Sequence, residues 1–379
     1  MENFIAYNPT KLHFGKDVLN GLGRSISKYG KRVLLVYGKG SIKKNGIYEK
    51  VMKQLDIIHA KVFEYEGIKP NPIIEDVNAA AEIGRKNDIE LILAVGGGSV
   101  IDSAKIISIA IPVHNDAWDF YKRIIKPQRA VPLICVLTLA ATGTEMNPFS
   151  VVQNHATNEK LGFGNDYLYP RHSFLDPQNT LTVPRDYTAY GIMDLISHCL
   201  EAYFGAGDAT LSDRFIISII KEAMEYGPQL LENLNDYELR AKIMFAATMA
   251  LNRITLYGKV SGDWGVHSIG HVISLLYDVP HGATLSIATI AWMNLLKEKL
   301  SDRLILLGQE LFNTQSPDGT IKAFESFFHK IECPIKLSEI GIDKDKRHEI
   351  YETMMINEVS GTNFKISESD FNALIGFMI

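Results

Sequence analysis

The sequence predicts a chain of two domains, an α/β domain with a mainly parallel sheet followed by an all-helical domain. Three observations carry this prediction. Short apolar runs alternate with amphipathic segments between residues 31 and 136. Residues 142–183 are rich in Asn, Gly, Thr and Pro, which interrupt regular structure. Helical periodicity dominates from residue 184 onward. We therefore expect the first domain at residues 1–183 and the second at residues 184–379.

Four apolar runs read as buried strands, at residues 32–37, 60–65, 91–95 and 131–137. Helix-period stretches separate them, and this alternation predicts a Rossmann-like sheet with helices on both faces. Such sheets bind nucleotides at the carboxyl ends of their strands. Two further strand-like pieces, 149–153 and 160–164, lie in the connector.

Helical periodicity marks a series of segments in the second half of the chain. They span residues 185–203, 210–226, 237–255, 262–277, 282–296, 301–313, 319–329 and 345–356. No internal repeat or long linker interrupts them, so we expect one helical domain packed against the first, with a shared cleft.

Composition excludes several classes of protein. The 379 residues include 39 basic and 44 acidic side chains, a net charge of −5 that disfavours a nucleic-acid partner. Apolar residues make up 46%, typical of a globular protein. The three cysteines lack CxxC spacing, and no apolar run reaches the length of a membrane span. These features predict a cytoplasmic protein that does not bind membranes.

A glycine-rich loop follows the strand at residues 91–95. Gly96, Gly97, Gly98 and Ser99 separate this strand from a helix that carries Asp102 in its first turn. Backbone without Cβ atoms lets phosphate oxygens approach, and the helix start favours negative charge. The pattern predicts a phosphate cradle, with a plain turn and a capping role for Asp102 as the alternatives.

The loop after the first predicted strand bears on the choice of cofactor. It contains Gly38, Lys39, Gly40, Ser41, Lys43 and Lys44. NAD-selective sites place a carboxylate here for the ribose hydroxyls, but no acid occurs between residues 33 and 48. Ser41 and the lysines suit a 2′-phosphate, which predicts NADP(H). The alternative is a solvated lysine patch.

Histidines and one aspartate form a pattern typical of a metal site. Asp194 and His198 lie four residues apart within one helical segment, and His267 and His271 repeat this spacing in another. His281 follows a proline where a third helix begins. Imidazole and carboxylate ligands without cysteine suit Fe(II) or Zn(II).

At these residues the sequence resembles the iron-containing (group III) alcohol dehydrogenase family, and within it the NADPH-dependent butanol dehydrogenase and aldehyde reductase branch. The resemblance covers essentially the whole chain. It rests on VYGKGSIKKNG, KPNP, AVGGGSVIDSAK, TLAATGTEMN, SFLDPQNTLTVPRDYTAYGIMDLISHCLE and YDVPHGA. The branch usually carries a Glu where this chain has Gly270 and a small residue where it has Leu275, so packing around the ligands is expected to differ.

The resemblance implies roles for individual residues. It implies metal ligation by Asp194, His198, His267 and His281, phosphate binding by Gly97, Gly98 and Ser99, and an adenosine-phosphate loop at Gly38 and Ser41. It also implies cofactor contacts in the cleft from Asn71, Thr138, Thr142, Asn147 and Lys160.

The function expected is reversible hydride transfer between NADP(H) and a small aliphatic alcohol or aldehyde, assisted by one divalent metal ion. His271 is the candidate proton relay, with a packing role as the alternative. Apolar residues near the ligands favour an apolar substrate, namely Phe149, Ile192, Leu195, Trp264, Val266 and Ile269. They disfavour a lyase like dehydroquinate synthase, which must bind an anionic substrate. An inactive family member is a third alternative, and relatives suggest a homodimer.

Overall fold

The computed structural model describes residues 1–379, which form two compact units. The α/β unit comprises Tyr7–Val183 and Asn235–Met244, and the helical unit comprises Met1–Ala6, Pro184–Leu234 and Phe245–Ile379. Two short segments, one at the amino terminus and one at residues 235–244, therefore belong to the unit opposite to the one that the sequence predicted. A domain boundary placed at a single residue cannot describe such segments, because their assignment depends on tertiary contacts and not on their position in the sequence.

A parallel sheet of six strands forms the centre of the α/β unit. Its strands lie in the order β1-β8-β5-β4-β2-β3, and every neighbouring pair is parallel. The strands are β1 (Lys11–Phe14), β2 (Arg32–Gly38), β3 (Lys61–Ile68), β4 (Leu91–Gly96), β5 (Leu133–Leu137) and β8 (His172–Leu175). The four strands predicted from apolar runs are confirmed.

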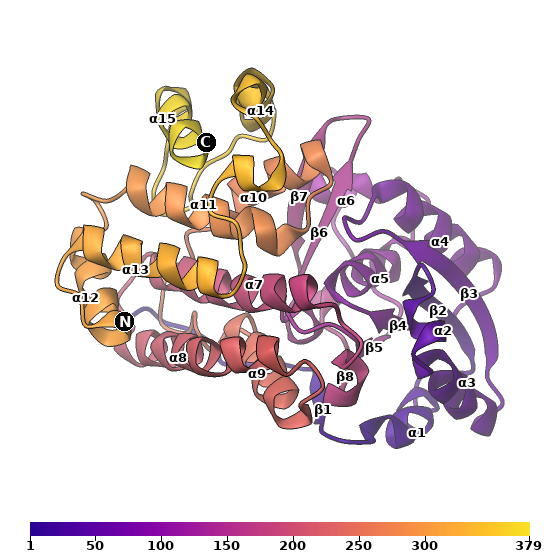
Figure 1. Ribbon diagram of the computed structural model, residues 1–379. Helices are drawn as coiled ribbons and strands as arrows, with labels where there is room; N and C mark the ends of the chain where they lie inside the picture. Colours follow the sequence, from indigo (N-terminus) through magenta and orange to yellow (C-terminus); the bar gives the residue numbers. More distant parts are fainter. The chain divides into compact units, whose positions relative to one another are not determined.

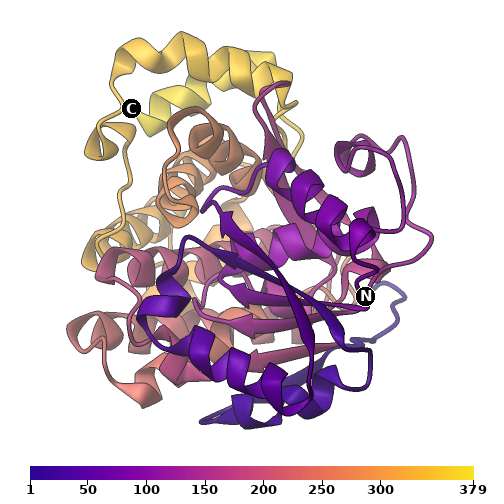
Figure 2. The same cartoon turned by 90° about the vertical axis from the view of Figure 1, so that its right-hand side faces the viewer.

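Side chains of the central strands alternate between two apolar cores, as a sheet covered on both faces requires. Val33 and Leu35 face one core with helices α1 and α3, whereas Leu34 and Val36 face the other with α4 and α5. Figures 1 and 2 show these helices on the two faces of the indigo and purple strands. The helices are α1 (Leu22–Ile26), α3 (Ile47–Ile57), α4 (Ile74–Lys86) and α5 (Gly98–Ala110).

Two strands, β1 and β8, were missed by the sequence analysis. Each is only four residues long, and His13 and His172 interrupt their apolar character. Residues 149–153 and 160–164, in contrast, do form strands, and they pair as the antiparallel hairpin β6 (Phe149–Asn154) and β7 (Glu159–Gly164). The remaining elements of this unit are α2 (Ser41–Lys44), α6 (Trp118–Tyr121), η1 (Val18–Gly21), η2 (Thr144–Met146), η3 (Asp166–Leu168) and η4 (Pro177–Thr180).

Long helices build the second half of the chain, as the periodicity predicted. They are α7 (Arg185–Tyr203), α8 (Thr210–Glu232), α9 (Tyr237–Ala250), α10 (Gly265–Tyr277), α11 (His281–Leu295), α12 (Ser301–Phe312), α13 (Pro317–Lys330), α14 (Arg347–Ile356) and α15 (Glu368–Met378), with η5 (Leu337–Ile340) and η6 (Lys344–Lys346). Helix α8 continues through Pro228, past its predicted end. Helix α15 was missed, although Ser367 and Asp370 form a capping box at its start. None of the helices combines the length and apolar character needed to cross a membrane.

Candidate functional site

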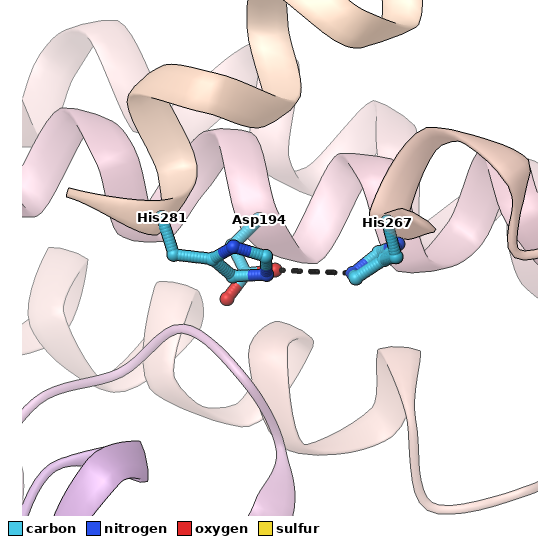
Figure 3. Close-up of side chains that lie close together, drawn as sticks. All are labelled: Asp194, His267 and His281. Carbon is cyan, nitrogen blue, oxygen red and sulfur yellow. Dashed lines mark ion pairs between the residues drawn. The ribbon is translucent and has the colours of Figure 1, made fainter. Parts of the chain in front are cut away.

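Three of the predicted metal ligands converge in the helical unit. Asp194 lies on α7, His267 on α10, and His281 is the first residue of α11. One ligand atom from each lies within 4.8 Å of the other two. Figure 3 shows both imidazoles directed toward the Asp194 carboxylate. The structure thus brings together residues from three helices that the sequence separates by up to 87 positions, the interval from 194 to 281.

His198, the fourth predicted ligand, lies beside this cluster. Its Nδ1 atom is 3.4 Å from Oδ1 of Asp194, one helical turn earlier, and its ring stacks on His267 with centroids 4.6 Å apart. It is not part of the group whose ligand atoms all lie within 4.8 Å of one another. The structure therefore assembles three of the four predicted ligands at one point and places the fourth against two of them.

The buried atoms of this cluster fit a metal ion. Oδ1 of Asp194, Nδ1 of His198 and Nε2 of His267 are shielded from solvent and have no hydrogen-bond partner. Orphaned polar atoms are costly in a protein interior unless something binds them. A carboxylate and neutral imidazoles are donors suited to Fe(II) or Zn(II).

Glu201 is a functional residue that the sequence analysis missed. Its Oε1 atom accepts a hydrogen bond from the backbone N–H of His267 at 2.9 Å and lies 3.2 Å from Nδ1 of the same residue. A proton held on Nδ1 by this carboxylate would leave Nε2, which lies 3.7 Å from Oδ1 of Asp194, as the nitrogen that can bind a metal ion. Asp194, His198 and Glu201 are spaced by four and three residues, so the helical repeat of α7 was the available signal.

The two neighbouring imidazoles have opposite pKa shifts. Burial lowers the pKa of His198 to about 4, because the charged ring loses its hydration. Burial acts in the same direction on His267, but the Asp194 and Glu201 carboxylates outweigh it and raise the pKa of His267 to about 9. Without a metal ion, His267 is therefore cationic at neutral pH and His198 is neutral.

His271 and Trp264 border the cluster. The His271 ring lies 5.4 Å from that of His281 and 6.4 Å from that of His267, measured between centroids. Trp264 precedes α10 in the left-handed conformation at φ 66° and packs edge-on against His267 at 5.7 Å. Both side chains are only partly buried.

The structure corrects the interpretation of four apolar residues that the sequence placed near the substrate. Their side chains are core residues of the helical unit with almost no exposed surface, namely Ile192, Leu195, Val266 and Ile269. Phe149 lies on β6 in the other unit. Trp264 packs against the imidazoles of His198 and His267.

Gly270 has a packing role. A Cβ atom at this position would lie 2.9 Å from Oγ1 of Thr284 and 3.0 Å from Cδ2 of Leu285, both on α11. Glycine therefore permits the close approach of α10 and α11, the helices that carry His267 and His281. Leu275, the other departure from the branch pattern, is buried in α10.

The predicted phosphate loop forms the start of α5 in the α/β unit. Gly97 is the N-cap of this 13-residue helix, and no side chain caps it, so its first N–H groups remain suited to an anion. A Cβ atom on Gly98 would lie 2.7 Å from Cγ2 of Thr142, which accounts for glycine there. The Ser99 hydroxyl donates to the carbonyl of Pro70, an arrangement that ties this loop to the KPNP segment.

Asp102 links α5 to the following connector. Oδ1 accepts a hydrogen bond from the Thr144 hydroxyl at 2.5 Å, and Oδ2 accepts one from the backbone N–H of Val151 at 2.9 Å. Both oxygens thus already have partners in the protein. The structure supports a positioning role for Asp102.

Lys105, on the same helix, is a second residue that the sequence analysis missed. Its ammonium is fully buried and donates to Oγ1 of Thr144 at 2.6 Å, Oδ1 of Asn147 at 3.0 Å and the carbonyl of Phe149 at 2.6 Å. Burial lowers the pKa of Lys105 to about 8. Asn147, predicted to face the cofactor, is therefore a buried partner of Lys105.

The other predicted cofactor residues occupy the same unit. Nζ of Lys160 donates to Oδ1 of Asn71 at 2.8 Å, so these two predicted residues lie together. The backbone N–H of Thr138 donates to the carbonyl of Gly96 at 3.0 Å, and Thr142 lies against Gly98.

The cofactor-selecting loop contains an ion pair that the sequence analysis did not foresee. Gly40, at φ 89°, precedes Ser41, the first residue of the short helix α2. Nζ of Lys43 lies 2.8 Å from Oε2 of Glu66 on β3. The pKa of Glu66 is lowered because Lys43 donates to its carboxylate. An acid therefore does reach this loop, from the neighbouring strand.

A parallel α/β unit with a glycine loop at the start of an uncapped helix is typical of dinucleotide-binding proteins, and clustered imidazoles with a carboxylate are typical of metal sites. Comparisons with known proteins define the family. Residues 9–177 match the model of the iron-containing alcohol dehydrogenases, and residues 188–375 match the carboxyl-terminal model of the same family. The chain belongs to the iron-containing alcohol dehydrogenase family.

Individual relatives resemble the chain over most of its length. It is 42% identical to the probable NADH-dependent butanol dehydrogenase 2 of Bacillus subtilis, over 91% of both chains. It is 35% identical to the NADPH-dependent aldehyde reductase YqhD of Escherichia coli, over 90% of both. The crystal structure of NADH-dependent butanol dehydrogenase A from Thermotoga maritima superposes with a TM-score of 0.97 at 35% identity, covering 100% of this chain and 99% of that one. These matches confirm the predicted family, its butanol dehydrogenase branch, the fold class, and alcohol dehydrogenase or aldehyde reductase activity.

Proposed function

We propose that the chain is a metal-dependent aldehyde reductase that interconverts small aliphatic aldehydes and primary alcohols. The observation that carries the proposal is the convergence of Asp194, His267 and His281, in which buried donor atoms of the first two face each other without a hydrogen-bond partner. We assign metal binding to these three residues and to His198. A divalent ion, Fe(II) or Zn(II), would supply a Lewis acid for the substrate oxygen, and the nicotinamide would supply or accept hydride.

The residues of this chain orient the metal ligands, bind the cofactor and move a proton. Glu201 holds the proton on Nδ1 of His267, which keeps Nε2 available as a donor atom. His271, partly exposed and next to His281, exchanges the proton that the alcohol oxygen gains or loses. The amino terminus of α5 binds the pyrophosphate of the cofactor through Gly97, Gly98 and Ser99.

For the cofactor we propose NADP(H), held by Ser41 with the exposed Lys39 and Lys44 in the loop that begins at Gly38. Lys43 is engaged by Glu66, so two of the three predicted lysines remain for a 2′-phosphate. NAD(H) is the second candidate, favoured by this ion pair and by the names of the NADH-dependent butanol dehydrogenases among the relatives. Kinetics with both reduced cofactors decide between them.

Trp264 favours an uncharged substrate with a short apolar chain, because it provides an aromatic surface beside the imidazoles. The test is kcat/KM across ethanal, propanal, butanal and hexanal, with glyoxylate and a sugar aldehyde as controls. Burial of each methylene should raise kcat/KM by at most about fourfold, from about 0.8 kcal/mol per methylene. A preference for either control over butanal would refute the substrate class.

The family match favours a dehydrogenase over the lyase alternative. We also propose that the chain is a cytoplasmic homodimer, which light scattering of the purified protein and fractionation of cells would check.

A further inference from the structure

Two carboxylates on β3 lie against the loop that follows β2. The strands are parallel, and their register sets Tyr37 opposite Glu66 just before Gly38. A Cβ atom on Gly40 would lie 3.7 Å from Oε1 of Glu66, so this carboxylate borders the loop itself. Strand pairing thus brings an acid to a loop whose own sequence has none.

The two carboxylates share one partner, since the Tyr37 hydroxyl also donates to Oε2 of Glu66 at 3.3 Å, and they differ in their other contacts. Glu64 accepts hydrogen bonds from the hydroxyls of Tyr37 at 2.6 Å and Tyr48 at 2.9 Å. Glu66 engages Lys43 at 2.8 Å, and the same ammonium lies over the rings of Tyr37 at 5.0 Å and Tyr48 at 5.4 Å. The ion pair is about half exposed, with 40% of the Lys43 side chain and 48% of the Glu66 side chain accessible to solvent, so a ligand can reach it.

The position of this pair relates to a bound dinucleotide. The uncapped start of α5 follows β4, and β2 is the neighbour of β4 in the sheet. A pyrophosphate at α5 therefore places one nucleoside over the carboxyl ends of β2 and β3, where such folds contact the ribose. A 2′-phosphate on this ribose would meet both charges of the Lys43–Glu66 pair.

We infer that Glu66 is a specificity-determining residue that weakens binding of a 2′-phosphorylated cofactor by engaging Lys43 and by presenting its own negative charge at the ribose end of the site. The inference rests on the proposed use of a nicotinamide dinucleotide. It assigns the choice between NAD(H) and NADP(H) to a residue on β3, outside the loop that carries the lysines.

The test compares two probes that differ only in the 2′-phosphate, adenosine 2′,5′-bisphosphate and 5′-AMP. Their dissociation constants are measured by calorimetry on the full chain without substrate. Glu66→Gln should tighten binding of the bisphosphate by about fourfold or more, the factor for removing one charge about 5 Å from a phosphate in water-like surroundings. The affinity for 5′-AMP should change by less than about twofold, and added salt should reduce the gain.

Glu64→Gln is the matched control, because it makes the same chemical change on the same strand without releasing Lys43. It should change the ratio of the two affinities less than Glu66→Gln does, because its carboxylate does not hold Lys43. In a Lys43→Gln background the gain from Glu66→Gln should shrink, since no ammonium is left to release. Equal thermal midpoints of the variants would show that the fold is intact.

Two outcomes would overturn the inference in distinguishable ways. If both probes bind and Glu66→Gln leaves their ratio at the wild-type value, Glu66 does not select the cofactor, and the proposed function stands. If neither probe binds the wild-type chain, the proposed dinucleotide site is wrong and the inference falls with it.

Discussion

Nδ1 of His267 lies 3.2 Å from Oε1 of Glu201, which is seven residues beyond Asp194 on α7. One helix thus carries both a predicted metal ligand and the carboxylate that orients a ligand from another helix. This geometry defines which nitrogen of His267 can bind a metal ion, because a proton kept on Nδ1 leaves Nε2 with its lone pair.

Loss of the Glu201 carboxylate should weaken metal binding. Glu201→Ala removes the acceptor that fixes the His267 ring, so we expect the affinity for Fe(II) or Zn(II) to fall about 10- to 100-fold. Metal titration of the stripped protein measures the change. Glu225→Ala, at an exposed position of α8, is the control and should bind metal like the wild type. Equal affinities in both variants would rule out the orienting role.

Metal binding should release a proton from His267. Its pKa of about 9 means that the metal-free site is protonated at neutral pH, and a metal ion must displace this proton. Affinity should therefore rise about tenfold per pH unit toward pH 9, and flatten above it. His198 adds no such dependence there because its pKa is lowered to about 4. Calorimetry in buffers of different ionisation enthalpy counts the proton, and a count of zero at pH 7 would contradict this account.

The sequence predicted a large part of this architecture. The four buried strands and the helices of the second half followed from apolar periodicity, which reports burial directly. The strands β1 and β8 could not be found this way, because each has only four residues, one of them a histidine, and shows no clear alternation. The pairing of these two strands depends on contacts between residues that are far apart in the sequence.

The residues of the candidate site were likewise predicted only in part. Spacing on single helices indicated Asp194, His198, His267 and His271. The roles of Glu201, Lys105 and Glu66 depend on contacts between elements, and a single helix or strand pattern does not report these contacts. The sequence also placed Ile192 and Leu195 near the substrate, whereas helical packing buries them in the core.

Replacing Lys105 should destabilise the α/β unit. Lys105→Met removes three hydrogen bonds from a buried site, so we expect a loss of about 2–4 kcal/mol in the free energy of unfolding. Lys221→Met breaks an exposed ion pair with Glu310 and should cost less than about 1 kcal/mol. Denaturant unfolding of both variants makes the comparison, and equal losses would argue against the buried network.

The same lysine gives a pH dependence with a defined sign. Its folded-state pKa of about 8 lies below the ordinary value of 10.5, so the unfolded chain binds more protons between these limits. The stability of the wild type relative to Lys105→Met should therefore increase as the pH rises from 8 toward 10.5. A difference that stays constant over this window would show that the lysine pKa is not shifted.

Removal of the His271 side chain and removal of the His267 side chain should have different effects on metal binding and turnover. His271→Ala should retain the metal and lower kcat by about 10²-fold or more at neutral pH, with a changed pH profile, because proton transfer is lost. His267→Ala should lose the metal and turnover while still binding nucleotide at the separate α/β unit. Metal analysis and steady-state kinetics on both variants test this, and a metal-free His271→Ala protein would assign that residue to the ligand set instead.

Aldehyde reduction by this chain should depend on a metal ion held by Asp194, His267 and His281. The most direct measurement is the rate of NADPH and NADH oxidation with butanal as Fe(II) or Zn(II) is titrated into the stripped wild-type and His267→Ala proteins. If turnover has this metal dependence, wild-type activity should rise with metal and saturate at one equivalent, while His267→Ala stays inactive at the same metal concentrations. Full activity in the stripped wild type, or restoration of His267→Ala by one equivalent of metal, would contradict it.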